Sequence, residues 1–383
     1  MMPKIRHAIS KMENQRISQV VRLGMEDPEV IPLWFGESDL VTPKFIREAA
    51  YEALNAGHTF YVNRRGLLPL RQEIQNYLSN LYPIDLDLDR ITVTASGMTS
   101  IMIAAEFLVN NGDNVVMVSP IWPNIFYVIE TMGGECRHVR LDEVDGEWTL
   151  DMDKLFDACD ERTKAIFVAT PGNPTGWMMS RQEQRDLLAF CRERNIWVIA
   201  DEVYHRIVYE EDISPSFLEI AEEEDPLFVI QSFSKSWAMT GWRLGWLVHP
   251  KSIADRVGDL SAINNTGATS FVQHAGVSAI QQGESFIHDM VERCRKGREI
   301  TYDYFSTMDR VSLSRTPAAF YAFFRVDGLE DDLGFAKELL STAKVGLAPG
   351  SAFGPGNEGY LRLCFAHDTQ NLSVALERLG EVL

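Results

Sequence analysis

The sequence lacks the features that mark several large classes of protein. No run of about 18 apolar residues occurs, so no membrane span is expected. The N-terminal stretch MMPKIRHAISKMENQRIS is polar and mixed in charge, without the apolar core of a secretory signal. Positive charge is scarce, because 36 Lys and Arg stand against 55 Asp and Glu and leave a net charge of −19. That balance disfavours nucleic acid as a partner.

Cysteine is sparse as well. The five cysteines are scattered and form no CxxC pair, which favours reduced thiols in a cytoplasmic protein. No HxxxH pattern or other cluster with metal-ligand spacing occurs, so we expect no bound metal. The remaining composition, 45% hydrophobic and 24% charged over 383 residues, is that of a globular protein too long for one simple core. Two domains are therefore expected.

Short apolar runs alternate with segments of helical period from Ile46 to about Gln282. Five runs are predicted to be buried strands, because they are short, rich in β-formers and apolar at consecutive positions. They are ITVTA from Ile91, NVVMVS from Asn114, AIFVAT from Ala165, IWVIAD from Ile196 and LFVIQS from Leu227. The alternation predicts an α/β fold with a mostly parallel sheet flanked by helices on both faces.

The C-terminal part of the chain has a different pattern. A long charged helix is expected from about Glu284 to Met308, followed by AAFYAFFRV, a helix, YLRLCFA and a last helix. The N-terminal arm has no strand pattern and is expected to lie on a neighbouring element. We therefore divide the chain into a large domain, 46–282, and a smaller α+β domain formed by residues 1–45 and 283–383.

Polar and reactive residues follow four of the predicted strands. ITVTA runs into SGM, AIFVAT into PGNPTG, IWVIA into DEVY, and LFVIQ into SFSK. Ligands of open α/β sheets bind beyond the carboxyl ends of the strands, so these loops are expected to meet at one edge. The stretch 96–98 would open a helix and, with Ser232, Ser234 and Arg243, would suit a phosphate dianion.

The same edge would carry four further groups: the amide of Asn173, the carboxylate of Asp201, the phenol of Tyr204 and the amine of Lys235. Pyridoxal 5′-phosphate needs this assortment. Its aldehyde condenses with a lysine amine, and its ring nitrogen needs a carboxylate to stay protonated and act as an electron sink. Its 3-oxygen needs donors. We therefore predict this cofactor, bound by the large domain.

The motifs resemble, in order along the chain, those of class I/II aminotransferases, the fold-type I family of pyridoxal-phosphate enzymes. They are FYVNRRGLLPLR, TASGMTS, SPIWPN, PGNPTG, DEVY, SFSKSWAMTGWRLG and PGSAFGPGNEGYLRLCFA. Each motif alone is weak evidence, but PGNPTG, DEVY and SFSK with an arginine eight residues after the lysine is a specific combination. The resemblance covers nearly the whole chain, from GESDLVTP at Gly36 to the strand around Arg362.

The resemblance implies three catalytic residues. Lys235 resembles the Schiff-base lysine, Asp201 the partner of the pyridinium nitrogen, and Tyr204 a donor to the 3-oxygen, together with Asn173. It also implies amino-group transfer between an α-amino acid and a 2-oxo acid with ping-pong kinetics. The freed Lys235 would move the proton between the substrate Cα and the cofactor.

Further residues resemble cofactor and substrate ligands. The implied phosphate site consists of Ser96, Gly97, Met98, Ser232 and Arg243. Trp122 resembles the aromatic residue that stacks on the cofactor ring. Tyr61 resembles a tyrosine that reaches the phosphate of a partner subunit, which implies a homodimer. The implied substrate site consists of Gly36, Asn173 and Arg362, with Arg362 on the α-carboxylate.

The substrate side chain is less clearly indicated. Some family members that prefer aspartate or glutamate place a lysine at the position of Met98, or an arginine in the loop that corresponds to SAINNTGATS from Ser261. This chain has neither, which favours neutral, apolar or aromatic donors. Arg64 and Arg65, close to Tyr61, keep an aspartate aminotransferase open, because they could supply charge across an interface.

Two other functions compete. A carbon–sulfur β-lyase of the same fold is suggested by PLW before Phe35, although GESD is more typical of an aminotransferase. A transcriptional regulator that uses this fold as a sensor would carry a DNA-binding helix-turn-helix ahead of it. The segment before Gly36 is short for that module, and the net charge of −19 disfavours it.

Overall fold

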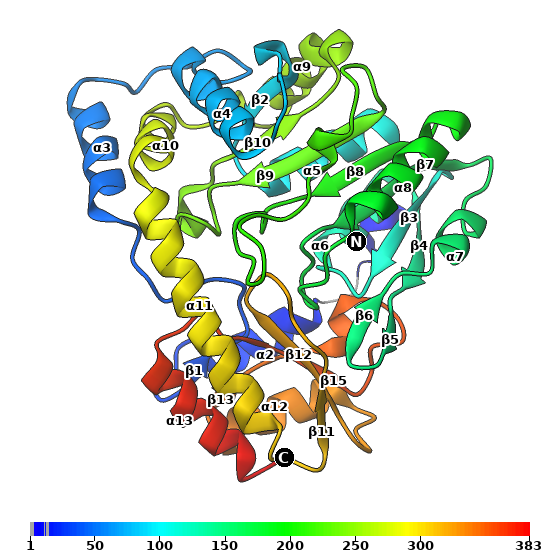
Figure 1. The fold of residues 1–383 in the computed structure, drawn as a ribbon, viewed down its shortest axis with the longest axis vertical. Helices are drawn as coiled ribbons and strands as arrows, with labels where there is room; N and C mark the ends of the chain where they lie inside the picture. The colour runs from blue at the N-terminus through cyan, green and yellow to red at the C-terminus, as the bar shows by residue number, and fades with distance from the viewer. Residues whose placement is uncertain (1–3, 11, 13–14) are drawn as a thin grey trace.

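The computed structural model describes residues 4–10, 12 and 15–383. A seven-stranded sheet lies in the upper part of Figure 1, and a four-stranded antiparallel sheet lies below it. The long helix α11 (Glu284–Phe305) runs down one side of the molecule from the first sheet to the second (Figure 1). This arrangement confirms the predicted fold class. The division of the chain at residues 46 and 282 stays a prediction.

The large sheet contains all five strands predicted from the apolar runs. In spatial order its strands are β2 (Ile91–Thr94), β10 (Gly245–Val248), β9 (Leu227–Ser232), β8 (Trp197–Asp201), β7 (Thr163–Ala169), β3 (Asn114–Ser119) and β4 (Glu135–Arg140). Neighbouring strands pair in parallel, except that β10 is antiparallel to both β2 and β9. The strands β10 and β4 were missed by the sequence interpretation.

Both faces of this sheet are buried. In β3, Val116 and Val118 belong to one hydrophobic cluster, while Val115 and Met117 belong to another on the opposite face. The first face is covered by α3 (Lys44–Asn55), α4 (Leu68–Leu81), α7 (Met152–Asp157), α8 (Arg181–Arg194) and α10 (Ser270–Gln282). The second is covered by α5 (Gly97–Leu108), α6 (Asn124–Met132) and α9 (Ala254–Asn265). Burial on both sides explains why the strands are continuously apolar.

A third hydrophobic cluster fills the lower part of the molecule. Its sheet has the order β11 (Val311–Leu313), β12 (Tyr321–Val326), β15 (Tyr360–Cys364) and β14 (Ala348–Pro349). The helices that pack there are α2 (Arg16–Gly24), α11, α12 (Asp332–Thr342) and α13 (Thr369–Gly380).

The N-terminal arm lies on the C-terminal segment. Its short strand β1 (Ile31–Pro32) pairs in parallel with β13 (Val345–Gly346). The arm also contains the short helix α1 (His7–Ser10). Elsewhere, β5 (Asp142–Val144) and β6 (Glu147–Thr149) form an antiparallel hairpin. Within the described residues, none of the helices combines the length and the apolar character that a membrane crossing requires.

Candidate active site

A cavity of about 430 Å³ lies where the carboxyl ends of the central strands face the smaller sheet. All but two of the predicted site residues line it: Gly36, Gly97, Met98, Trp122, Asn173, Asp201, Tyr204, Ser232, Lys235, Arg243 and Arg362. They come from both sheets, since Asp201 ends β8 while Arg362 belongs to β15. Among the described residues, no group of three or more His, Cys, Asp or Glu side chains is placed to hold a metal ion.

Lys235 lies in the connection between β9 and β10 and reaches the N-terminal arm. Its Nζ donates a hydrogen bond to the carbonyl oxygen of Gly36 at 2.5 Å. Burial lowers the pKa of Lys235 to about 8, against the smaller opposing effect of charges that include the carboxylate of Asp201. A larger fraction of this amine is therefore neutral near pH 7 than for an exposed lysine, as a nucleophile or general base requires.

Two adjacent acids have different surroundings. Asp201 accepts one hydrogen bond, from the backbone N–H of Val203 at 3.3 Å, and burial raises its pKa to about 6. Glu202 does not line the cavity. It accepts hydrogen bonds from Ser216 Oγ at 2.7 Å and from Gln231 Nε2 at 3.2 Å, among others. Glu202 thus fixes the loop, while Asp201 keeps acceptor capacity for a ligand.

One corner of the cavity is formed by the start of α5. Ser96 caps this helix, because its Oγ accepts a hydrogen bond from Thr99 N at 3.0 Å, and it does not line the cavity. Gly97 does line it. A side chain at Gly245 would place a Cβ 2.7 Å from Gly97 N, so the glycine allows the helix start to lie against β10.

Hydroxyl groups and a cation complete this corner. Ser232 Oγ donates to Ser234 Oγ at 2.9 Å. Arg243, with a left-handed φ of 56°, donates from Nη1 to the carbonyl oxygen of Thr240 at 2.5 Å. No carboxylate of the described residues forms an ion pair with Arg243. Helix N–H groups, hydroxyls and an arginine without an acid are the donors that a phosphate group requires.

A buried arginine forms the opposite side of the cavity. Arg362 is 2% exposed, and its Nη1 donates to Asn173 Oδ1 at 3.0 Å while Nη2 donates to the carbonyl oxygen of Trp34. Its Nε has no hydrogen-bond partner. The guanidinium lies over the ring of Tyr321, 4.6 Å from the centroid, and no acid of the described chain pairs with it. A buried cation of this kind favours an anionic ligand.

Tyr321 was missed by the sequence interpretation. Its hydroxyl is hydrogen-bonded to that of Tyr204, and burial raises the pKa of both phenols. A Cβ on Gly36 would collide with the hydroxyl of Tyr321. The aromatic run AAFYAFFRV indicated a core strand, and nothing in it distinguished this tyrosine. Residues 15–18 of the arm were also missed, and they line the cavity as well.

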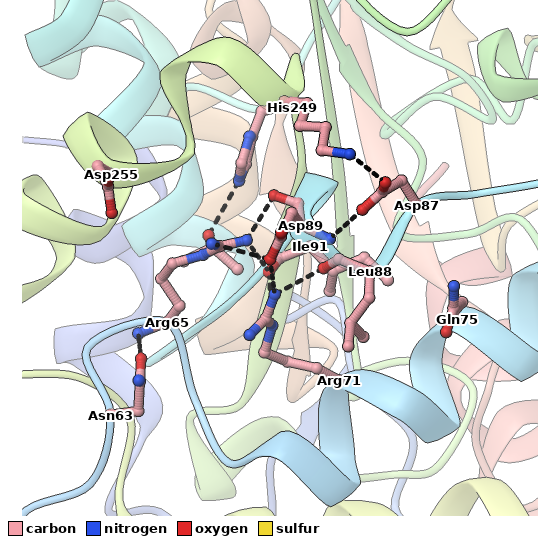
Figure 2. Close-up of polar contacts among 12 residues, drawn as sticks. Asn63, Arg65, Arg71, Gln75, Asp87, Leu88, Asp89, Ile91, His249 and Asp255 are labelled. Atoms are coloured by element: carbon pink, nitrogen blue, oxygen red, sulfur yellow. Dashed lines mark hydrogen bonds and ion pairs between the residues drawn. The ribbon is translucent and has the colours of Figure 1, made fainter.

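Tyr61 lies outside this cavity. It is 88% exposed, beside Phe60 at 81%, along a second pocket that residues 265–271 also line. The two nearby arginines are paired within their own chain: Arg64 with Asp255 at 3.0 Å, and Arg65 with Asp89 at 3.3 Å. Figure 2 shows the side chains of Arg65 and Arg71 converging on Asp89, next to His249.

The chain matches a known protein family and curated relatives over most of its length. Residues 28–379 match the profile of the family described as aminotransferase class I and II. The aspartate aminotransferase of Pyrococcus horikoshii is 30% identical over 376 residues, covering 97% of this chain and 95% of that protein.

Solved structures of aminotransferases are also similar to this chain. The aspartate aminotransferase of Thermotoga maritima superposes with a TM-score of 0.88 at 29% identity, over 98% of this chain and 99% of that one. An aromatic aminotransferase from Pyrococcus horikoshii has a TM-score of 0.86 at 29% identity, over 96% and 98% of the two chains. The names of these relatives agree on the reaction and differ in the substrate.

Proposed function

Because the chain belongs to the aminotransferase class I and II family and is therefore an aminotransferase, we propose that it works with pyridoxal 5′-phosphate held covalently at Nζ of Lys235. The reaction proposed is transfer of the amino group from an α-amino acid to a 2-oxo acid. The observation that carries the proposal is the meeting, in one cavity, of a lysine with a lowered pKa, a carboxyl with spare acceptor capacity and an anion-binding corner.

The residues of the cavity fit this cofactor. Gly97, Ser232 and Arg243 would bind the phosphate group, since Arg243 forms no ion pair with an acid of the described residues. Trp122 would pack on the ring, and Ser96 would act through the start of α5, which it caps. When bound, pyridoxal phosphate supplies an electron sink that stabilises negative charge at the substrate Cα.

The ionisable and polar side chains of the cavity would each hold or move a proton. Asp201 would hold a proton at the ring nitrogen, and Asn173 and Tyr204 would donate toward the 3-oxygen. Lys235, with its pKa lowered to about 8, would take the proton from the substrate Cα and return it. Arg362 would bind the substrate α-carboxylate and hold the Cα–H bond in the orientation that proton transfer requires.

We also propose that the preferred amino donor is neutral, apolar or aromatic. Met98, Ile101 and Ile121 line the cavity, and the segment 261–270, from the end of α9 to the start of α10, contains no lysine or arginine. Arg64 and Arg65 are held by aspartates of their own chain. A carboxylate buried among these apolar side chains and away from a cation costs several kcal/mol, so aspartate, whose short side chain would place it there, should be a poor donor.

A homodimer is the proposed assembly. Tyr61 and Phe60 are exposed aromatic residues on one loop, and Ile263 nearby in α9 is 77% exposed. Exposed apolar groups of this kind favour burial against a second copy. Mixing inactive Tyr61→Ala and Arg243→Ala variants should restore part of the activity if Tyr61 completes the phosphate site of its neighbour. A fully active monomer in light scattering would count against this assembly.

The central test is chemical trapping at Lys235. Reduction of the purified protein with borohydride should fix the cofactor to the peptide that contains Lys235, as read by mass spectrometry. An adduct on another lysine, or none, would refute the proposal.

A panel of amino donors, with 2-oxoglutarate and pyruvate as acceptors, then ranks the substrates. Release of pyruvate and ammonia from cystathionine would instead identify a β-lyase.

A further inference from the structure

A cation with no role in the proposal above faces the cavity. Four basic residues line it, and Arg16 is the one that binds neither the cofactor nor the α-carboxylate in that proposal. Arg16 begins α2, and residues 15–18 form part of the wall. Its side chain is exposed, and its Nη1 donates to Ser351 Oγ at 2.9 Å. Arg16 forms no ion pair with any acid of the described residues.

The position of Ser351 places Arg16 on the substrate side. Ser351 and Phe353 belong to the same short helix, η5 (Gly350–Phe353). Ser351 contacts Arg16, and the ring of Phe353 lies under the guanidinium of Arg362, 5.0 Å from centroid to Cζ. The phosphate corner is formed by other elements, α5 and the β9–β10 connection. Arg16 and Arg362 therefore both contact η5, which places Arg16 on the side of the cavity where the substrate would bind.

An acid that shares Ser351 with Arg16 is already engaged. Asp332 is 2% exposed and accepts hydrogen bonds from both the N–H and the Oγ of Ser351, the latter at 2.7 Å. This bonding holds Ser351 in place as an acceptor for Arg16. It leaves the rest of the guanidinium directed toward solvent and the cavity, where an anion can pair with it.

From this placement we infer that Arg16 binds the distal carboxylate of a dicarboxylic 2-oxo acid, the amino acceptor of the second half-reaction. The inference rests on the proposed function. An apolar donor leaves Arg16 hydrated at the rim, which costs little because the side chain is exposed. A dicarboxylic acceptor places its second carboxylate on Arg16 while Arg362 binds the first. One cavity can thus take two different side chains without a cation in its apolar part.

The variant Arg16→Gln tests this role when the two half-reactions are followed separately by the absorbance of the bound cofactor. The second-order rate constant for 2-oxoglutarate should fall by about tenfold or more, as for loss of a charged hydrogen bond, through a higher KM. The values for pyruvate and for an apolar donor should stay within about twofold of wild type. Arg16→Lys should retain part of the preference. Arg22→Gln, an exposed arginine of α2 outside the cavity, is the matched control.

Equilibrium binding gives a second readout that needs no turnover. Glutarate should bind the cofactor-loaded wild type more tightly than pentanoate does, and calorimetry should find this difference reduced in Arg16→Gln. Added salt should weaken glutarate binding to wild type more than to the variant. Equal losses for 2-oxoglutarate and pyruvate, or no loss for either, would overturn the inference. Failure of every donor to convert the cofactor in wild type would instead refute the proposed function.

Discussion

Two sets of arginines in this protein have opposite surroundings. One group is paired with aspartates at the far end of the large sheet: Arg64, Arg65 and Arg71. The other group lines the cavity and pairs with no acid of the described residues: Arg16, Arg243 and Arg362. Figure 2 shows two members of the paired group, Arg65 and Arg71, which share Asp89.

The difference is informative because acids are abundant. The chain carries 55 Asp and Glu against 36 Lys and Arg, so an arginine without an acid nearby is not explained by a shortage of acids. Arg362 is the buried member of the second group, and leaving it unpaired has a cost in folding free energy, which an anionic ligand offsets on binding. The three paired arginines stabilise the chain itself, whereas the three unpaired ones that line the cavity are available to ligands.

The largest expected effect concerns Arg362. Arg362→Gln should lower kcat/KM for all amino acids by about a hundredfold or more, since it removes a buried partner of the α-carboxylate. Arg362→Lys should restore little, because an ammonium group cannot reproduce the planar contacts with Asn173 and Tyr321. Steady-state kinetics measure both variants, with cofactor absorbance as the control for folding. Unchanged kinetics would show that Arg362 stabilises the fold, as the paired arginines do, and does not bind the substrate.

A somewhat smaller effect is expected for Arg243. Arg243→Gln should raise the dissociation constant of the cofactor by about tenfold to a hundredfold, the range for a charge-assisted hydrogen bond. Equilibrium dialysis of the apoprotein with pyridoxal phosphate measures it. Arg256→Gln, an exposed arginine of α9, serves as the control. Equal affinity in the two variants would contradict the phosphate role.

The same reasoning extends to Lys235, which also lacks a paired acid. Covalent attachment requires the neutral amine, and burial lowers the pKa of Lys235 to about 8. The rate of cofactor attachment to the apoprotein should therefore rise with pH, by about tenfold per unit well below pH 8, and level off above it. Stopped-flow absorbance measures this profile. A rate still rising steeply at pH 10 would mean that the amine titrates like an exposed lysine.

The smallest effect is expected in the paired group. The Arg64 side chain is 40% exposed and its partners Asp255 and Asp259 are 86% and 49% exposed. Arg64→Gln should change the free energy of unfolding by less than about 1 kcal/mol and leave the substrate preference intact. Chemical denaturation and the donor panel measure the two. A selective loss of activity with aspartate would show that Arg64 acts across a subunit interface.

Much of the fold was predictable because the central strands are buried on both faces and therefore uniformly apolar. Two strands of the large sheet, β4 and β10, were not predicted, for different reasons. β4, ECRHVR, lies at the sheet edge and is half exposed, so it has no apolar run. β10 begins two residues after Arg243 and has only four residues. Its antiparallel insertion between β2 and β9 depends on pairing between distant segments, which the periodicity of the sequence does not indicate.

The candidate site residues that lie at or just after the ends of strands could be predicted from the sequence. Asp201, Ser232 and Lys235 lie in short segments whose residue types indicate their chemistry. Arg16 and Tyr321 were not predicted, since they reach the cavity from distant segments packed against it. Tyr61 and the homodimer stay predictions, because their contacts involve a second copy.

The hairpin of β9 and β10 also limits how this protein can be re-engineered. Ser232 and Gly245 are opposite each other in the ladder, and the connection between them carries both Lys235 and Arg243. The spacing between amine and guanidinium is thus set by one closed loop, so an inserted residue would move one relative to the other. The exposed turn at Asp145 and Gly146 carries no such pair. Inserted peptides, fusion partners or new chain termini belong in that turn and not between residues 232 and 245.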